Sequence, residues 1–233
     1  RRDSRQQLLQ SRQDASSLLC QVVVLLPYQA WEKAALHLHL EGAISPETLA
    51  ELAPGLTPEE VHSHYTHQGF LGFLDNFKRA NQKLRTPENY ALIARRCLED
   101  LARQNIRYAE VMISAGVVIW KSQDLAAVFD AIAREAAHSA VTIRWILDAV
   151  RQLPVEDAWK VVELAVARRH QGVVAFGLGG DEMRGPAQRF REVCRYAVQH
   201  GLHLSLHAGE NAVPESIWGA LEVGADRIGH GFR

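Results

Sequence analysis

Histidines and carboxylates stand in short clusters in this sequence, with a spacing that could hold a metal ion. His37, His39 and Glu41 alternate with apolar residues, and alternate side chains of a β-strand point to the same face. Two imidazoles placed in this way can bind one Zn²⁺ at about 2.0–2.1 Å. The same alternation is also typical of an ordinary half-buried strand, so this cluster alone leaves both interpretations open.

Three further clusters carry groups of the same kind. His207-Ala208-Gly209-Glu210 offers one metal ligand and one acid or base, and Gly229-His230-Gly231 sets a histidine between two glycines. In Gly179-Gly180-Asp181-Glu182, the paired glycines let a backbone N–H approach a ligand closely. The last two clusters also fit an ordinary turn and an ordinary strand-to-helix loop.

Taken together, the clusters indicate one metal site. Three histidines on separate stretches would form a nitrogen-rich site with an open coordination position. A site of this type lowers the pKa of a bound water to about 7. Glu210 and His230 would then handle protons beside it, so the chemistry indicated is metal-assisted hydrolysis.

The elements that must position these clusters alternate along the chain. Apolar runs rich in Val and Ile predict about six strands, and their composition is typical of parallel strands buried on both faces. Helical patterns separate them, which favours an α/β barrel with its active site at the carboxyl ends of the strands. An open doubly wound sheet is the rival, but its Gly-rich dinucleotide fingerprint is missing. The strands are expected at residues 34–40, 106–114, 141–149, 173–178, 202–207 and 227–229.

Helix starts are marked by three Pro-containing caps, at Ser45, Thr57 and Thr86. Later helices are expected at 124–138, 154–170, 186–200 and 214–223. Before the Thr86 helix, Phe70, Phe73, Leu74 and Phe77 recur at helical spacing. This stripe predicts either a core-facing surface or a lid over a site.

The domain organisation is expected to be simple. Residues 1–30 form a polar, poorly defined lead-in, in which the apolar run 18–26 could pass for part of a signal peptide. Residues 31–233 form one barrel domain that lacks the last two of eight strands.

Composition excludes several classes of function. The 233 residues carry 26 Lys+Arg and 27 Asp+Glu, a formal net charge of -1, so no basic excess indicates nucleic acid as a partner. No apolar run approaches the roughly 20 residues that span a membrane. Three widely separated cysteines indicate a reducing compartment, and a cytoplasmic location is expected.

The motifs together resemble one known family. His-Leu-His-Leu-Glu-Gly-Ala at 37–43, Gly-Gly-Asp-Glu at 179–182, His-Ala-Gly-Glu at 207–210 and Arg-Ile-Gly-His-Gly at 227–231 resemble the adenosine deaminase family, from about Lys33 to the last residue. The resemblance implies a zinc-dependent (β/α)8 TIM barrel. Such enzymes replace the 6-amino group of a purine by oxygen and release ammonia.

The resemblance also implies roles for individual residues. His37, His39 and His207 match the ligands of one Zn²⁺ per chain. Glu210 matches the acid that protonates the purine ring nitrogen N1, and His230 matches the histidine that orients the attacking water and takes its proton.

Substrate contacts are implied at His39, at Glu41 near the sugar or ring, and at Gly180, whose backbone meets the purine edge. Adenosine or 2′-deoxyadenosine is the expected substrate. Aminodeoxyfutalosine and adenine are alternatives within the family. A non-catalytic purine-binding or scaffold barrel is an alternative outside it, and the oligomeric state is left open.

The sequence departs from the family in one respect. The family's fourth metal ligand is an aspartate on the last strand, followed by a second aspartate, whereas the last aspartate here is Asp226, before His230. We therefore expect a C-terminally truncated fragment that is inactive alone. Barrels that bridge two metals also begin with His-x-His, but Glu210, three residues after His207, fits a mononuclear site better. The cytidine deaminase type, which needs Pro-Cys-x-x-Cys, is excluded.

Overall fold

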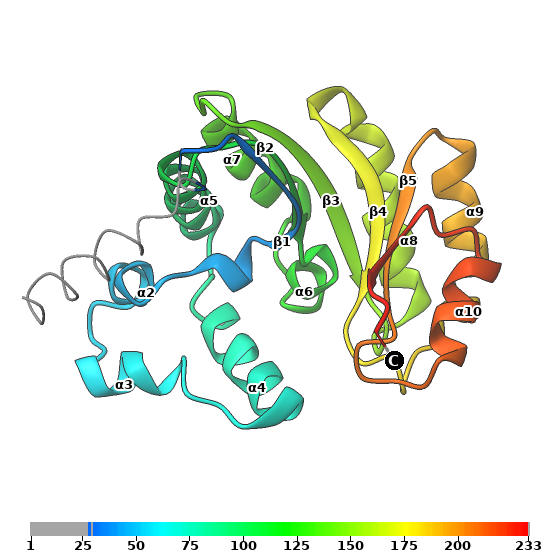
Figure 1. Ribbon diagram of the computed structural model, residues 1–233, viewed down its shortest axis with the longest axis horizontal. Helices are drawn as coiled ribbons and strands as arrows, with labels where there is room; N and C mark the ends of the chain where they lie inside the picture. Colours follow the sequence, from blue (N-terminus) through cyan, green and yellow to red (C-terminus); the bar gives the residue numbers. More distant parts are fainter. Residues whose placement is uncertain (1–27, 29, 233) are drawn as a thin grey trace, which may run out of the picture.

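The computed structural model describes residues 28 and 30–232, so Cys20 and the signal-like run 18–26 lie outside the described residues. Its centre is one parallel sheet whose strands lie side by side in chain order (Figure 1). The six predicted strands are confirmed to within about two residues at their ends. They are β1 (Lys33–His39), β2 (Ile106–Ile113), β3 (Thr142–Val150), β4 (Val173–Gly179), β5 (His203–Ala208) and β6 (Arg227–His230).

The sheet curls, so that its first and last described strands approach one another. The Arg227 guanidinium on β6 donates a hydrogen bond to the Leu36 carbonyl on β1 at 3.4 Å. A Cβ atom at Gly229 would lie only 2.7 Å from Cε1 of His37. This curvature, with helices outside, is that of a partial (β/α)8 barrel, as predicted.

Helices cover the outer face of the sheet (Figure 1). Between β1 and β2 lie η2 (Glu41–Ala43), α2 (Pro46–Leu52), α3 (Pro58–Ser63), α4 (Gly69–Asn81) and α5 (Pro87–Arg103). Between β2 and β4 lie α6 (Ala115–Trp120), α7 (Leu125–Ala136), α8 (Val155–Ala167) and η3 (Arg169–Gln171). The remaining elements are η4 (Ala187–Phe190), α9 (Arg191–Gln199) and α10 (Glu215–Glu222).

The three predicted helix starts are confirmed. The Ser45 hydroxyl accepts from the Thr48 N–H, and Thr57 forms a reciprocal capping box with Glu60. Thr86 forms a second box, in which Asn89 supplies the returning side chain. Each start satisfies backbone donors that the helix cannot bond internally.

Two predicted helices were wrong in detail, and one short helix was missed. The helix expected at 154–170 ends at Ala167, and Arg169–Gln171 form the separate turn η3. The helix expected at 186–200 is divided, because Phe190, the last residue of η4, adopts φ -103° and ψ 12° just before α9 begins. The short helix α6 was not predicted at all. It rests directly on β3, since a Cβ atom at Gly116 would lie 2.9 Å from the Val150 nitrogen.

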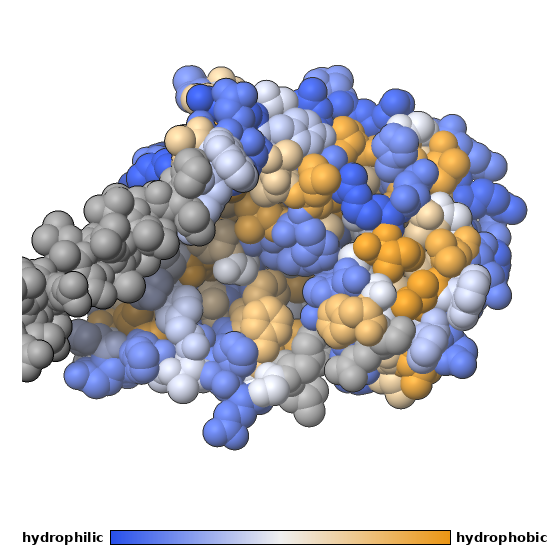
Figure 2. All heavy atoms as spheres, in the orientation of Figure 1, coloured by the Kyte–Doolittle hydropathy of each residue, from blue (hydrophilic) through white to orange (hydrophobic). Residues whose placement is uncertain are grey.

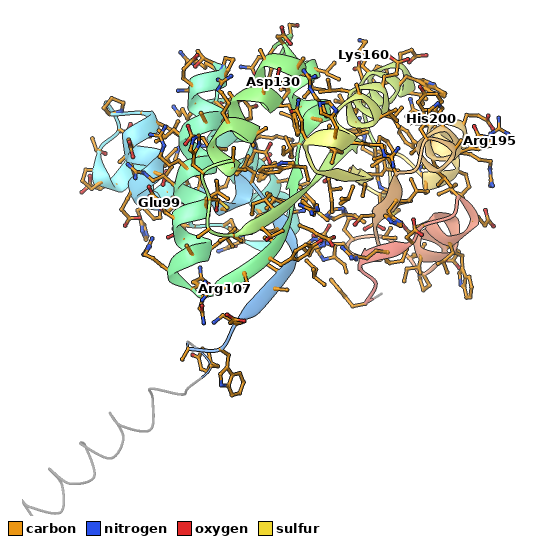
Figure 3. All side chains as sticks on the ribbon, turned by 90° about the horizontal axis from the view of Figure 1, so that it is seen from above. Glu99, Arg107, Asp130, Lys160, Arg195 and His200 are labelled. Carbon is orange, nitrogen blue, oxygen red and sulfur yellow. The ribbon has the colours of Figure 1, made fainter. Side chains whose placement is uncertain are left out.

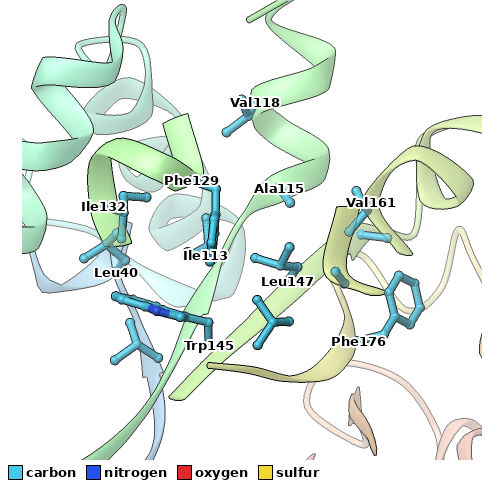
Figure 4. Close-up of a cluster of buried hydrophobic side chains, with 14 of the residues drawn as sticks. Leu40, Ile113, Ala115, Val118, Phe129, Ile132, Trp145, Leu147, Val161 and Phe176 are labelled. Atoms are coloured by element: carbon cyan, nitrogen blue, oxygen red, sulfur yellow. The ribbon is translucent and has the colours of Figure 1, made fainter. Parts of the chain in front are cut away.

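The core has two layers. The larger one fills the space between sheet and helices and includes Phe129, Trp145 and Phe176 (Figure 4). The smaller one lines the inner face of the sheet, where Met112 pairs with Ile146, and Ile146 with Ala175, on three adjacent strands. Side chains of an inner layer like this one fill the centre of a barrel.

The outside of the helix layer is charged, and side chains such as Glu99, Lys160 and Arg195 point away from the protein (Figure 3). Exposed apolar side chains include Leu36 on β1 and Trp218 and Leu221 on α10. Figure 2 shows hydrophobic groups at the surface over β6 and α10. Among the described residues, no helix is long and apolar enough to cross a membrane.

Candidate active site

Three histidines converge at the carboxyl ends of β1 and β5. The ligating atoms of His37, His39 and His207 all lie within 4.8 Å of one another, and the Nε2 atoms of His39 and His207 are 2.9 Å apart. Two nitrogens bound to one ion in a tetrahedral site at ~2.05 Å lie about 3.3 Å apart. The predicted cluster is therefore brought together with nearly the spacing that a single zinc ion requires.

The local electrostatics keep these imidazoles neutral. Burial, and then the other histidines, lower the pKa of His39 to about 4 and that of His207 to about 2. Burial, followed by His230 and Arg227, also lowers the pKa of His37. A metal binds the neutral form of imidazole, so the ring nitrogens are ready for an ion at neutral pH. The Nδ1 atom of His207 is buried without a hydrogen-bond partner.

A buried carboxylate stands behind one of these histidines. Asp148, 3% exposed at the end of β3, has its Oδ2 atom 3.9 Å from Nδ1 of His39. Gly177 is its neighbour on β4, and any side chain there would collide with the Asp148 carboxyl group. Burial, and then the charge of Glu41, raises the pKa of Asp148 well above its usual value. Asp148 was not among the predicted site residues, although a lone aspartate in the apolar run 141–149 was the available signal.

The predicted alignment of Glu41 with the two histidines is wrong. β1 ends at His39, and Glu41 begins the short helix η2, so it no longer follows the alternation of the strand. Its carboxylate is buried and accepts hydrogen bonds from the backbone N–H of Ser114 at 3.0 Å and from the Ser114 hydroxyl at 3.2 Å. Glu41 therefore ties the turn after β1 to the end of β2.

Glu210 and His230 lie beside the histidine cluster, as predicted. Their Oε2 and Nε2 atoms are 3.6 Å apart, and the ring of His230 lies 5.0 Å from that of His37 and 5.2 Å from that of His207. Burial raises the pKa of Glu210, although His230 opposes this effect. His230 adopts φ +71°, an uncommon conformation for a residue other than glycine. Backbone conformations of this kind gather at functional sites.

Gly180 follows β4 at the same end of the sheet. Its φ is +95°, and a Cβ atom would lie 2.5 Å from Oε1 of Gln152. That oxygen accepts the N–H of Asp181 at 3.0 Å. The preceding Gly179 is close to the cluster, since a Cβ atom there would lie 3.6 Å from Nδ1 of His207. Gly179 and Gly180 thus leave two residues without side chains in the turn beside the histidine cluster.

Two buried charged residues that received no role from the sequence hold the segment after β5. Arg151 is fully buried and donates to the carbonyl oxygens of His207 and Gly185. The Glu182 carboxylate accepts from the backbone after His207. Glu182 stood inside a predicted cluster, but its partners are 27 or more residues away in sequence and no local pattern indicates them.

The aromatic stripe before the Thr86 helix is not a core surface at the position of Phe73, which is 40% exposed. Its ring packs 6.1 Å from that of Phe77 on α4. Phe77 in turn reaches to within 4.0 Å of a Cβ position at Gly42, in the turn after β1. α4 therefore lies beside the carboxyl end of β1, and the side chain of Phe70 lies outside the described residues. The lid interpretation stays a prediction.

A sizeable hollow among the described residues lies elsewhere. A cavity of about 750 Å³ lies at the amino ends of β3 and β4 and is lined by residues such as Arg144, Trp145 and Gly172. In the part of the chain that the structure describes, no cluster of metal-ligating side chains lines this cavity. Ligands of α/β barrels bind at the opposite end, beyond the carboxyl ends of the strands, so we place the candidate site at the histidines.

Comparison with known proteins identifies the family. Residues 32–233 match the family described as adenosine deaminase. The chain belongs to the adenosine deaminase family. The adenosine deaminase motifs that carried the resemblance are thus the same residues that the fold gathers at one end of the sheet.

Relatives within the family carry more than one name. The chain is 35% identical over 213 residues to an aminodeoxyfutalosine deaminase of Streptomyces coelicolor, a match that spans 85% of this chain and 55% of that protein. It is 33% identical over 223 residues to an adenosine deaminase of Mycolicibacterium vanbaalenii, which spans 86% and 61%. The chain therefore spans less than two thirds of the length of these relatives.

Solved structures of similar fold agree. An adenine deaminase from Arthrobacter aurescens superposes with a TM-score of 0.76 at 28% identity, covering 86% of this chain and 64% of that one. A zinc-bound amidohydrolase from Burkholderia ambifaria superposes with a TM-score of 0.79 at 26% identity, covering 88% and 60%. Both comparisons support the partial barrel.

Proposed function

We propose that the protein catalyses hydrolytic deamination of a 6-aminopurine nucleoside, with adenosine or 2′-deoxyadenosine as first choice, giving the 6-oxopurine and ammonia. One observation carries this proposal. Three neutral imidazoles converge within 4.8 Å, and beside them stands a carboxyl group of raised pKa within 3.6 Å of a fourth imidazole. Hydrolysis at an electron-poor ring carbon needs an activated water, an acid and a base, and this site offers groups for each.

The residues fit one zinc ion per chain. The donor set is three ring nitrogens that lie within 4.8 Å of one another, which suits the coordination of a single ion. When bound, the ion would act as a Lewis acid that makes water a nucleophile at neutral pH. His37, His39 and His207 would hold it, and the family's further ligand would complete the coordination.

Proton transfer is assigned to the two neighbouring residues. The Glu210 carboxyl group would donate its proton to purine N1, which makes C6 electrophilic. His230 would accept the first proton of the attacking water and pass it to the departing amino group, which leaves as ammonia. The second water proton, on the new C6 hydroxyl, returns to Glu210, and N1 keeps its hydrogen in the 6-oxo product.

Substrate orientation is assigned to the backbone and to the cluster itself. Gly180, with no side chain, would let its N–H reach the purine edge, as glycine permits close backbone approach. His39 would contact the substrate from the side of the histidine cluster. Glu41, whose buried carboxylate is held by the N–H and hydroxyl of Ser114, would act near the sugar or ring.

A second substrate has comparable support. The aminodeoxyfutalosine deaminase of Streptomyces coelicolor is 35% identical to this chain, against 33% for the adenosine deaminase of Mycolicibacterium vanbaalenii. Two percentage points do not separate the activities. Adenine is a third candidate because the similar Arthrobacter structure is an adenine deaminase.

The test measures metal and turnover on one preparation of the natural full-length protein. We expect one zinc per chain, and ammonia release with an ultraviolet change for one member of a panel of adenosine, 2′-deoxyadenosine, adenine and aminodeoxyfutalosine. His207→Asn should abolish both zinc and turnover. The matched control His200→Asn, at the exposed residue that follows α9 (Figure 3), should change neither.

The outcomes separate the alternatives. Zinc with turnover of another 6-aminopurine would replace the substrate and keep the mechanism. Zinc and tight purine binding without any turnover would favour a scaffold or binding role. Absence of zinc from the folded protein, even after zinc is added, would reject the metal site.

A further inference from the structure

Glu182 is a buried carboxylate with an unusual set of partners. It is 4% exposed and lies just after β4, in the loop before η4. Its Oε2 atom accepts the N–H of Gly209 at 2.7 Å, and its Oε1 atom accepts the N–H groups of Glu210 at 2.9 Å and Asn211 at 3.2 Å. The Ser216 hydroxyl also donates to Oε2. Four donors match the roughly four acceptor sites of one carboxylate.

Three of these donors are consecutive backbone amides, which ordinary loops do not point at one spot. They do so here because Gly209 adopts φ +70°, in the left-handed region. Consecutive N–H groups turned inward in this way form an anion-binding concavity. The carboxylate of Glu182 fills that concavity, and an ionised carboxylate makes stronger hydrogen bonds than a neutral group.

The segment so held is the one that presents Glu210. Its backbone N–H is fixed to Glu182, while its carboxyl group stands 3.6 Å from the ring of His230. Arg151 fixes the start of the same segment through the carbonyl oxygen of His207. We propose that Glu182 is a positioning residue, which holds residues 209–211 through their backbone so that Glu210 faces the histidine cluster.

This inference rests on the proposed function for its effect on catalysis, but not for the geometry itself. The experiment therefore has two readouts on the full-length protein loaded with zinc. Hydrogen exchange of the 209–211 amides reports on the loop whether or not any purine is turned over. Kinetics with the best substrate of the panel report on the consequence for Glu210.

In Glu182→Gln, one carboxylate oxygen becomes an NH₂ group that faces N–H donors. We expect exchange of the 209–211 amides to accelerate at least tenfold, and kcat to fall by about 10²-fold, with KM changed by less than about threefold. Zinc content should stay at the parent value, because the ligands are the imidazoles of other residues.

Ser216→Ala is the matched control, because it removes the one donor that lies outside residues 209–211 and leaves the carboxylate. We expect exchange of the 209–211 amides and kcat to stay within about threefold of the parent. A loss of kcat equal to that of Glu182→Gln would show that Glu182 acts through α10, and would overturn the proposal.

Unchanged exchange of the 209–211 amides in folded Glu182→Gln would overturn it as well, whatever the activity. If Glu182→Gln does not fold, Glu182→Asp takes its place, since it keeps the charge but is one methylene shorter. It should show intermediate exchange and kcat, and parent-like exchange in that variant would overturn the proposal. Absence of turnover in the parent would reject the proposed function alone, because exchange would still decide the role of Glu182.

Discussion

Two buried regions of the protein differ sharply in what they contain. Between the sheet and its helices, the buried side chains are apolar, as with Phe129, Ile132 and Phe176. At the carboxyl ends of the strands, charged and polar groups such as Asp148, Arg151 and Glu182 are buried instead. Burial of an ionised group costs free energy unless hydrogen bonds compensate it. The apolar region therefore stabilises the fold. The polar region at the strand ends lowers that stability but places chemical groups at the site.

Of the substitutions that distinguish the two regions, the largest loss of kcat is expected at Glu210. Glu210→Gln should lower kcat by about 10²–10⁴-fold, because an amide cannot donate the proton that a carboxyl group of raised pKa supplies. Zinc content should not change. Steady-state kinetics with metal analysis check this. The control Glu215→Gln, at an exposed position on α10, should keep the parent kcat, and a kcat at that level in Glu210→Gln would remove Glu210 from the mechanism.

A smaller effect, on zinc affinity, is expected at Asp148, which lies behind His39. Asp148→Asn should weaken zinc affinity by about 10–100-fold, since a carboxylate behind a ligating histidine orients the ring and raises its basicity. Competition with a zinc chelator measures this affinity. Asp130→Asn removes a carboxylate that pairs with Arg168 on the outer helices and should leave zinc affinity within about twofold. Equal affinities in the two variants would place Asp148 among the residues that only stabilise the fold.

The buried carboxylate of Glu182 predicts a dependence on pH. Burial raises its pKa, but the hydrogen bonds from Ser216 and the 209–211 amides outweigh burial and leave the pKa below the usual 4.5. A carboxyl group with a depressed pKa stabilises the folded state above its unfolded pKa and loses that contribution as the pH falls.

The difference in unfolding free energy between the parent and Glu182→Gln should therefore be constant near neutral pH and shrink once the pH falls below 4.5. Urea unfolding of the zinc-free proteins at a series of pH values measures it. A difference that persists unchanged through the acid range would show that the charge of Glu182 contributes nothing to stability.

The smallest effect is expected in the apolar layer. Ile132→Val, at a fully buried position on α7, should reduce the free energy of unfolding by about 0.5–1.5 kcal/mol. Zinc affinity and kcat should remain at parent values, because Ile132 lies in the apolar layer between the sheet and the helices and not at the histidine cluster. Chemical denaturation and the two assays above check this. A loss of zinc affinity in this variant would mean that the two regions are not separable.

Most of the fold could be predicted from the sequence, because its signals are local. The apolar runs at 106–113 and 142–150 mark strands, and the Ser45, Thr57 and Thr86 caps mark helix starts by hydrogen bonds within three residues. The helix α6 could not be predicted in this way. Its apolar residues, rich in Val and Ile, fit a strand equally well, and its close packing on β3 at Gly116 involves residues more than 30 positions away.

In the candidate site, too, residues with local sequence signals could be predicted, and residues whose roles depend on distant partners could not. His37, His39, His207, Glu210 and His230 could be predicted because they stand in recognisable motifs. The expected orientation of Glu41 failed, since alternation along β1 stops where the chain turns into η2. Asp148 could not be assigned because its role depends on His39, two strands away in the sheet. Supporting residues of this kind are defined by partners distant in the chain.

The approach of β1 to β5 and β6 has a consequence for how the protein folds. The contact between His39 and His207 joins residues 168 positions apart, and that between Leu36 and Arg227 joins residues 191 positions apart. Contacts of such long sequence separation form late, because the entropy of closing the intervening loop must be overcome first. During refolding, helix content should therefore recover before the capacity to bind zinc, and the histidine cluster would report that the sheet has finished closing.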